Sequence, residues 1–227
     1  MKVVLCTPTL TKPHPANVDA GLASVAALDA AGFEHSTVFE IGCPYISAAR
    51  ANMLRKALDA KADVVVFIDH DLSWRPQDLV TLINTTGDVV AGTYRFKKDE
   101  EEYMAAIDCR PDGTPIVLSD GNLRGERVPA GFLKVTAEAV DRFMKAYPEL
   151  VYGVSYNPSV DLFNHGAHKG VWYGEDYAFS RRWRECGGEI VLVPDLDLTH
   201  HGDKPYPGNF HRFLLAQPGG SEFKEAA

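Results

Sequence analysis

Hydrophobic and polar positions alternate along the first 93 residues in segments of strand length and of helix length. Polar caps or breakers bound the helical segments, with Asn17 and Ser47 as the expected N-caps of the first two. The sequence predicts strands over 2–6, 35–41, 63–68 and 88–93, and helices over 17–31, 47–60 and 76–84. Because this alternating order is typical of helix-covered parallel sheets, it predicts an α/β fold with a mostly parallel, doubly wound central sheet flanked by helices.

The pattern changes after residue 96. The charged run KKDEEE predicts a solvated loop, and residues 103–127 predict short strands joined by turns. A helix is expected over 137–146, and residues 148–175 are expected to form a long loop rich in aromatic residues and histidine. Glu175 and Asp176 begin a further helix that ends at Gly187, and two strands follow over 189–193 and 196–202. With no internal repeat and no clear linker, a single domain over 1–227 is expected.

The segment VVVFIDHDLSW places two carboxylates directly after the most apolar predicted strand. If the extended backbone persists, Asp69 and Asp71 share a face and repel each other unless a cation lies between them. Mg²⁺ or Mn²⁺ would relieve that repulsion and could bridge to phosphate, at the sheet edge where α/β proteins bind ligands. The alternative is a structural role in helix capping. Capping requires only one short polar side chain, and Ser73 is better placed for it before Pro76.

Other polar residues stand where local structure does not favour them. Arg50 opposes the helix dipole and Asn52 is a poor helix former, so both are expected to face the cleft, unless they are simply exposed. His200 and His201 end the last predicted strand, and one of them could complete a mixed nitrogen and oxygen site for Mn²⁺, unless they form a surface pair. The helix dipole alone could explain the acids Glu175 and Asp176, although they directly follow the aromatic loop.

Composition restricts the class of protein. The chain has 227 residues and a formal net charge of −8, which argues against non-specific binding to nucleic acid or to an anionic membrane. Its four cysteines are widely spaced, so free thiols in a reducing compartment are expected. MKVVLCTPTL is predicted to be a first strand and not a signal peptide, and no apolar run is long enough to span a membrane. We expect a soluble cytoplasmic protein, located in the host cytoplasm if a virus encodes it.

A set of motifs extends over nearly the whole chain: TPT, AARAN, IDHD, VPAGF, GEDYAFSRRWRECGG and HHG followed by YPGNF. This set resembles the GT-A-fold glycosyltransferases, and most closely the small family-2-like members, including those of bacteriophages. The resemblance implies a Rossmann-like GT-A domain with a nucleotide-binding half (1–95) and an acceptor-binding, metal-completing half (96–227). It implies Mn²⁺ or Mg²⁺, a nucleoside-diphosphate-sugar donor and a hydroxyl acceptor. A glycan, a small molecule and a hydroxymethylated DNA base all stay open as acceptors.

The resemblance also implies roles for individual residues. Asp71 would ligate the metal, Asp69 would contact ribose or the metal, and His200 would be the third ligand, with His201 as the alternative. Asp176 would be the general base of an inverting transfer, with Glu175 beside it at the catalytic position. The residues expected along the nucleotide and the sugar are Thr7, Pro8, Arg50, Asn52, Asp69, Gly131 and Phe132.

Two other classes of function stay open. DHDLS also resembles the DxDx[ST] motif of aspartate-nucleophile phosphatases, in which Asp69 would become phosphorylated. Those enzymes have the motif after their first strand, whereas two predicted strands precede it here. The other class is a module that binds a nucleotide sugar or a glycan without turnover.

Overall fold

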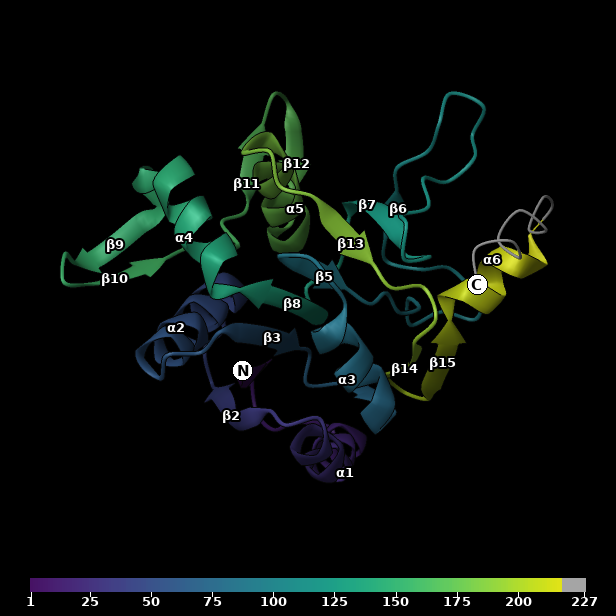
Figure 1. The fold of residues 1–227 in the computed structure, drawn as a ribbon, viewed down its shortest axis with the longest axis horizontal. Helices are drawn as coiled ribbons and strands as arrows, with labels where there is room; N and C mark the ends of the chain where they lie inside the picture. The colour runs from purple at the N-terminus through teal and green to yellow at the C-terminus, as the bar shows by residue number, and fades with distance from the viewer. Residues whose placement is uncertain (218–227) are drawn as a thin grey trace.

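An eight-stranded mixed sheet organises the chain in this computed structural model, which describes residues 1–217. Its strand order is β2-β1-β3-β8-β5-β13-β7-β6 (Figure 1). In chain order the strands are β1 (Lys2–Thr9), β2 (Glu34–Ile41), β3 (Val64–Ile68), β5 (Val89–Ala91), β6 (Ala106–Ile107), β7 (Leu123–Arg127), β8 (Phe132–Thr136) and β13 (Ile190–Leu192).

Most strands of this sheet point in one direction. β1 pairs parallel with β2 and β3, and β13 pairs parallel with β5. β8 lies antiparallel between β3 and β5, and β7 is antiparallel to both β13 and β6. Only β7 and β8 run opposite to the other six strands of this sheet. The predicted α/β class with a mostly parallel sheet is therefore confirmed. Antiparallel β8 was not expected between the early strands; its residues Phe132–Val135 are buried, which suits a central position.

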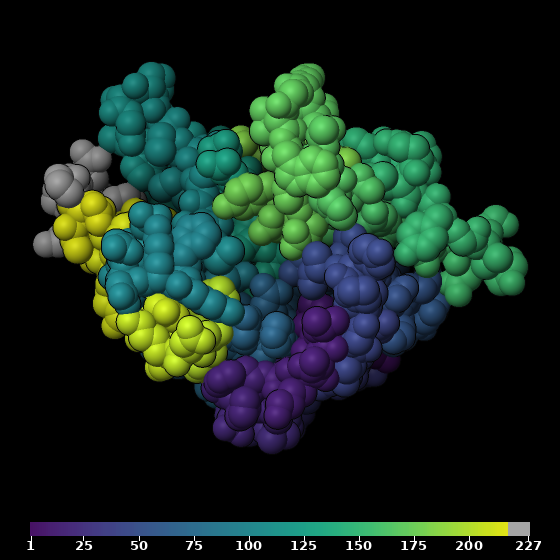
Figure 2. All heavy atoms as spheres, turned by 180° about the vertical axis from the view of Figure 1, so that it is seen from behind, coloured from purple at the N-terminus to yellow at the C-terminus, as the bar shows by residue number. Residues whose placement is uncertain are grey.

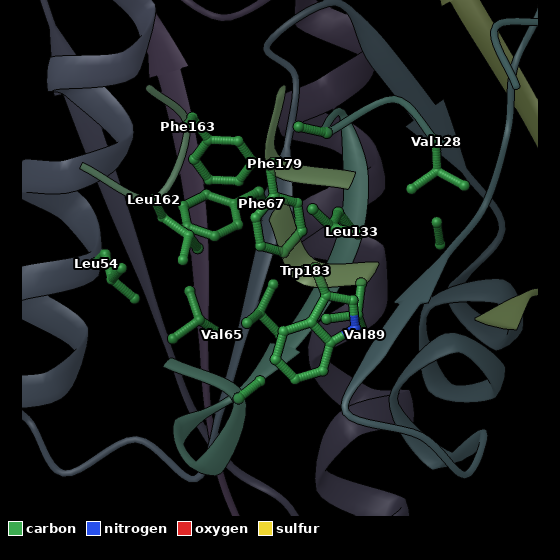
Figure 3. Packing of buried hydrophobic residues seen from close by; sticks show 14 of the residues in the cluster. Leu54, Val65, Phe67, Val89, Val128, Leu133, Leu162, Phe163, Phe179 and Trp183 are labelled. Atoms are coloured by element: carbon green, nitrogen blue, oxygen red, sulfur yellow. The ribbon is translucent and has the colours of Figure 1, made fainter. Parts of the chain in front are cut away.

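Helices cover both faces of the sheet. α1 (Pro15–Ala30) and α3 (Pro76–Asn84) pack on one face, and α2 (Ile46–Asp59), α4 (Ala137–Ala146) and α5 (Glu175–Glu185) pack on the other. Within β3, Val65 and Phe67 face the second group of helices, where Phe67 meets Phe163 edge-on (Figure 3). Val64, Val66 and Ile68 face the first group. The run VVVFI is uniformly apolar because both sides of β3 are buried.

The helix starts differ from the predicted caps. α1 begins at Pro15 with His14 as its N-cap, and Asn17 lies buried inside the helix. α2 begins at Ile46, so Ser47 is within its first turn. Arg75 and Asp78 form the cap of α3 in place of Ser73. Asn17 is not a cap because its side chain is used in a tertiary contact with the end of β3, described below.

Residues 148–175 were expected to form a loop and instead form two hairpins. After the short 3₁₀ helix η1 (Pro148–Leu150), β9 (Val151–Val154) pairs with β10 (Asn157–Val160), and β11 (Gly166–His168) pairs with β12 (Val171–Tyr173). Lys169 and Gly170 join β11 to β12 with φ of 48° and 80°, as a two-residue hairpin turn requires. These strands are short and largely exposed, so they lack the apolar alternation that would have predicted them. In Figure 2 the β11–β12 hairpin and the segment between β6 and β7 form two separate projections, with a hollow between them.

A second sheet of three antiparallel strands has the order β15-β14-β4. Its strands are β4 (Leu72–Trp74), β14 (Asp197–His201) and β15 (Pro205–Asn209), after which α6 (Phe210–Ala216) follows. β14 agrees with the predicted strand over 196–202. The β4–β14 register sets His200 opposite Leu72, next to Asp71. This small sheet therefore brings the histidine pair to the carboxylates that follow β3.

Two further findings concern the cysteines and the helices of the described residues. All four cysteines are free. None of the helices in residues 1–217 combines the length and the apolar character needed to cross a bilayer.

Candidate active site at the carboxyl ends of the strands

The two carboxylates after β3 lie on a tight turn and not on a continuing strand. The Leu72 N–H donates to the Asp69 carbonyl at 3.1 Å. The Asn17 side-chain amide, buried under the turn, donates to the carbonyls of Asp69 and Leu72 at 3.0 Å each. Because of this turn, the side chains of Asp69 and Asp71 contact different residues. This corrects the expectation that both carboxylates lie on the same face of an extended strand.

Asp69 has a partner for each carboxylate oxygen. The Arg50 guanidinium donates to Oδ1 at 2.8 Å, and the Tyr94 hydroxyl donates to Oδ2 at 2.9 Å. Burial, followed by the nearby Asp69 charge, raises the pKa of Tyr94 well above its ordinary value, so Tyr94 stays a neutral donor. A Cβ added at Gly131 would overlap both the Tyr94 hydroxyl and the Asp69 carboxylate. A glycine is required there for these groups to meet.

Arg50 links the end of β3 to the start of α5. Its side chain is almost fully buried, and its guanidinium pairs with Asp69 at 2.8 Å and with Glu175 at 2.9 Å. The guanidinium also lies over the Phe163 ring, 5.1 Å from its centre. Burial by itself would lower the pKa of Arg50, but the charges of Asp69 and Glu175 raise it, so Arg50 stays protonated. Asn52, expected beside it, instead lies exposed on α2 and donates to Glu40 at 3.3 Å.

Asp176 is a partly buried carboxylate at the start of α5, beside Glu175. Its Oδ1 accepts from the Tyr177 N–H at 2.7 Å. Burial, and then the charge of Glu175, raise the pKa of Asp176 to about 6. An acid that served only the helix dipole would have a lowered pKa. A carboxylate with this pKa is suited to accepting a proton near neutral pH.

Asp71 lies next to His200 and Lys97. The His200 Nε2 is 3.6 Å from Asp71 Oδ1, and the Lys97 ammonium pairs with Oδ2. Burial alone would raise the pKa of Asp71, but hydrogen bonds from His200 and Lys97 and their charges lower it well below its usual range. The His200 Nδ1 lies 2.8 Å from the Arg95 carbonyl, which can only accept. Nδ1 therefore donates to that carbonyl, and Nε2 is the ring nitrogen that faces Asp71.

His201 points away from this group. Its Nε2 is 2.8 Å from the Ser73 hydroxyl, and its ring stacks on His14 with a separation of 4.3 Å between ring centres. Burial, and then the neighbouring His14, lower the pKa of His201. Because side chains alternate along β14, only His200 can face Asp71.

Asp71 and His200 fit a divalent cation that takes its other ligands from water and phosphate. Mg²⁺ and Mn²⁺ sites of this kind commonly use one or two protein ligands together with substrate phosphates. Among residues 1–217, no three His, Cys, Asp or Glu side chains converge as a complete metal cluster. Asp69 is not a ligand in this arrangement, because Arg50 and Tyr94 bind its two carboxylate oxygens. The Tyr94 and His200 rings meet edge-on, with 5.0 Å between their centres, so the residues around Asp69 contact those around Asp71.

The other expected residues lie deeper in the fold. Thr7 and Pro8 are buried in β1, which extends to Thr9. Phe132 is fully buried against Trp74, with 5.8 Å between their ring centres. This burial corrects the expectation that the Phe132 ring lies beside a sugar; it supports the site from within the core.

Three residues of the site were not identified from the sequence: Asn17, Tyr94 and Lys97. Asn17 was interpreted as a helix cap and Lys97 as part of a solvated charge run. Tyr94 gave the clearest signal, because it follows β5 at the same sheet edge as Asp69. Its position shortly after the end of a predicted strand could therefore have indicated Tyr94 as a residue of the site.

Comparisons with known proteins bear on the fold. No protein-family model matches the sequence, and no curated protein matches it. A structure of the catalytic domain of Drosophila beta1,4galactosyltransferase 7 with xylobiose is similar over 84% of this chain and 64% of its own, with 14% identity and a TM-score of 0.47. A mutant of that enzyme with manganese, UDP-Gal and xylobiose is similar over 96% of this chain and 75% of its own, with 14% identity and a TM-score of 0.48. The inositol-1-phosphate CTP transferase from T. maritima is similar over 97% of this chain and 96% of its own, with 10% identity and a TM-score of 0.45.

These likenesses concern the fold alone. The chain spans less than two thirds of the galactosyltransferase domain bound to xylobiose. The function proposed below therefore rests on the residues of the site itself.

Proposed function

We propose that this protein is a metal-dependent glycosyltransferase that moves a sugar from a nucleoside-diphosphate donor to a hydroxyl acceptor. The observation that supports this most is the double ion pair of Arg50, with Asp69 after β3 and Glu175 at the start of α5. One buried side chain thereby joins the sheet edge suited to a nucleotide to the helix that begins with Asp176. A donor site and a base are both needed for sugar transfer, and here they are adjacent.

In the proposed reaction, Asp176 takes the proton of the acceptor hydroxyl while that oxygen bonds to the anomeric carbon. The bond between the anomeric carbon and the diphosphate oxygen breaks, and the nucleoside diphosphate leaves. A direct displacement of this kind inverts the configuration at that carbon. Mn²⁺ or Mg²⁺ held by Asp71 and His200 would offset the negative charge that develops on the leaving diphosphate. Glu175 and Arg50 are positioning residues, because they fix Asp69 and the start of α5.

The charge balance of a cavity between β7 and α5 favours a carbohydrate or another small molecule as the acceptor. This cavity has a volume of about 660 Å³, and its lining includes Tyr173, Tyr177 and four arginines. Three of these arginines are paired with acids, so the cavity has little excess positive charge for a nucleic-acid backbone. The pairs are Arg124 with Glu189, Arg181 with Glu185, and Arg184 with Asp108. A modified DNA base is the alternative acceptor.

A thermal-shift screen of nucleoside diphosphates with Mn²⁺, followed by incubation with a panel of nucleotide sugars, tests this function. A ligand present at about 100 times its Kd adds about 2.7 kcal/mol to the free energy of unfolding. We expect stabilisation by at least one diphosphate, and transfer or slow hydrolysis of its sugar conjugate.

Binding of a diphosphate without turnover of any nucleotide sugar would indicate a binding module in place of an enzyme. Phosphatase activity alone would overturn the proposal, although the occupied Asp69 oxygens do not suit a nucleophile. Steep salt dependence of acceptor binding would indicate DNA.

The two histidines are expected to differ in metal binding. His200→Ala should weaken Mn²⁺ binding by about 10-fold or more, because it removes the imidazole that faces Asp71. His201→Ala is the matched control and should leave Mn²⁺ affinity unchanged, since its ring contacts Ser73 and His14. Isothermal titration of Mn²⁺ into both variants measures the effect. The reverse ranking would assign the ligand to His201, and two unchanged affinities would exclude histidine from the metal site.

A further inference from the structure

We propose that Lys97 is a second cation of this site, which pairs with Asp71 before the metal binds and with the donor diphosphate afterwards. This inference rests on the proposed function, because it takes Asp71 and His200 as the metal ligands. It assigns diphosphate binding to a residue of the charged run 97–102, which the sequence alone indicated to be a solvated loop.

The Lys97 ammonium is bound to the same carboxylate that would ligate the proposed metal. It pairs with Asp71 Oδ2, while His200 Nε2 lies 3.6 Å from Oδ1. The lysine stem reaches this point over Gly202, where an added Cβ would come within 3.0 Å of the Lys97 Cδ. The glycine that follows the histidine pair thus leaves room for the stem.

The backbone that bears Lys97 is fixed to the same site. The Arg95 carbonyl accepts from His200 Nδ1, and the Phe96 N–H donates to the Glu102 carbonyl at 3.0 Å. The Arg95 guanidinium donates to the Asp99 carbonyl at 2.9 Å, which closes the base of the loop. The Lys97 backbone is therefore anchored beside His200, whereas its four-carbon side chain can still change rotamer. An ammonium displaced from Asp71 stays close to that carboxylate.

Charge determines where the displaced ammonium goes. A divalent cation bonded to Asp71 repels the ammonium and has a stronger interaction with the carboxylate, because it has twice the charge. The diphosphate brings several anionic oxygens to the metal, and lysine binds phosphate as a flexible point charge. Lys97 should therefore oppose metal binding in the free protein and favour diphosphate binding in the metal-loaded protein.

Two titrations of the full chain test these opposite effects: Mn²⁺ alone, and inorganic pyrophosphate at saturating Mn²⁺. Lys97→Met keeps the stem over Gly202 and removes the charge. It should bind Mn²⁺ about 5-fold more tightly, because the competing ion pair is lost. It should bind pyrophosphate about 10-fold more weakly, because a charge-assisted contact is lost. Lys98→Met is the matched control, since Lys98 pairs with Glu102, and it should change neither affinity. Lys97→Arg should restore pyrophosphate binding.

The outcomes separate this inference from the proposed function. If wild-type protein binds neither Mn²⁺ nor pyrophosphate, the metal-diphosphate site itself is wrong. If wild type binds both and Lys97→Met matches Lys98→Met, the role of Lys97 is overturned while the site stands. Tighter Mn²⁺ binding with unchanged pyrophosphate affinity would reduce Lys97 to a competitor of the metal and would also overturn the inference.

Discussion

Asp176→Asn should lower turnover by about 10²–10⁴-fold while leaving donor affinity unchanged, because asparagine keeps the shape of the side chain and removes the basic oxygen. The same change should raise the melting temperature at pH 8. Burial and Glu175 raise the pKa of Asp176 to about 6. The folded state therefore holds this proton more tightly than the unfolded state does. The stabilising contribution is complete below the unfolded pKa of about 4 and is lost as the pH rises through about 6.

Steady-state kinetics, donor titration and thermal unfolding measured together test Asp176. Wild-type turnover should fall as the pH drops below about 6, since protonated Asp176 cannot accept a proton. Glu138→Gln is the matched control, because Glu138 is an exposed acid in the first turn of α4. It should cost about 0.3–1 kcal/mol of stability through the helix dipole and leave turnover intact. An Asp176 variant that melts lower and still transfers sugar at the wild-type rate would show that the base lies elsewhere.

Asp71→Asn should abolish turnover, with a loss of about 10³-fold or more, and chelation of the wild-type protein should do the same until Mn²⁺ or Mg²⁺ is restored. The amide keeps the size of the carboxylate and removes the negative charge that would hold the metal. A modest loss of stability is also expected, of about 1–2 kcal/mol at neutral pH, since His200 and Lys97 would lose their charged partner. Because the pKa of Asp71 is lowered in the fold, that stability is present above pH 4 and lost as the pH falls.

The control for Asp71 is Asp99→Asn. Asp99 also pairs with a lysine, Lys204, but is exposed and has no histidine beside it. Its loss should leave metal dependence and turnover unchanged, as measured by activity across a Mn²⁺ series and by circular dichroism of both variants. Full wild-type turnover in excess chelator would contradict the metal assignment whatever the variants do.

The sequence by itself was sufficient for the elements whose pattern is local. α3 and α4 have the predicted bounds, Pro76–Asn84 and Ala137–Ala146, because turn residues and apolar spacing within a few positions define them. The apolar run before Asp69 was correctly predicted to be a strand buried on both faces. The position of Asp69, at the carboxyl end of that strand, follows from the same pattern.

Only the tertiary structure determined which of these residues meet. Antiparallel β8 lies in the sheet between β3 and β5, and Gly131, directly before β8, leaves the space in which Tyr94 meets Asp69. Arg50 and Glu175 are 125 residues apart in the sequence, and no local periodicity indicates their contact.

The difference between His200 and His201 has the same origin. The register of β4 against β14 turns His200 toward Asp71, and a shift of one residue would have presented His201 instead. The raised pKa of Asp176 likewise depends on burial by distant segments, whereas its position at a helix start would by itself have predicted a lowered pKa. Local patterns determine strands and helices because they act between near neighbours. The site depends on register and burial, which are properties of the whole packed chain.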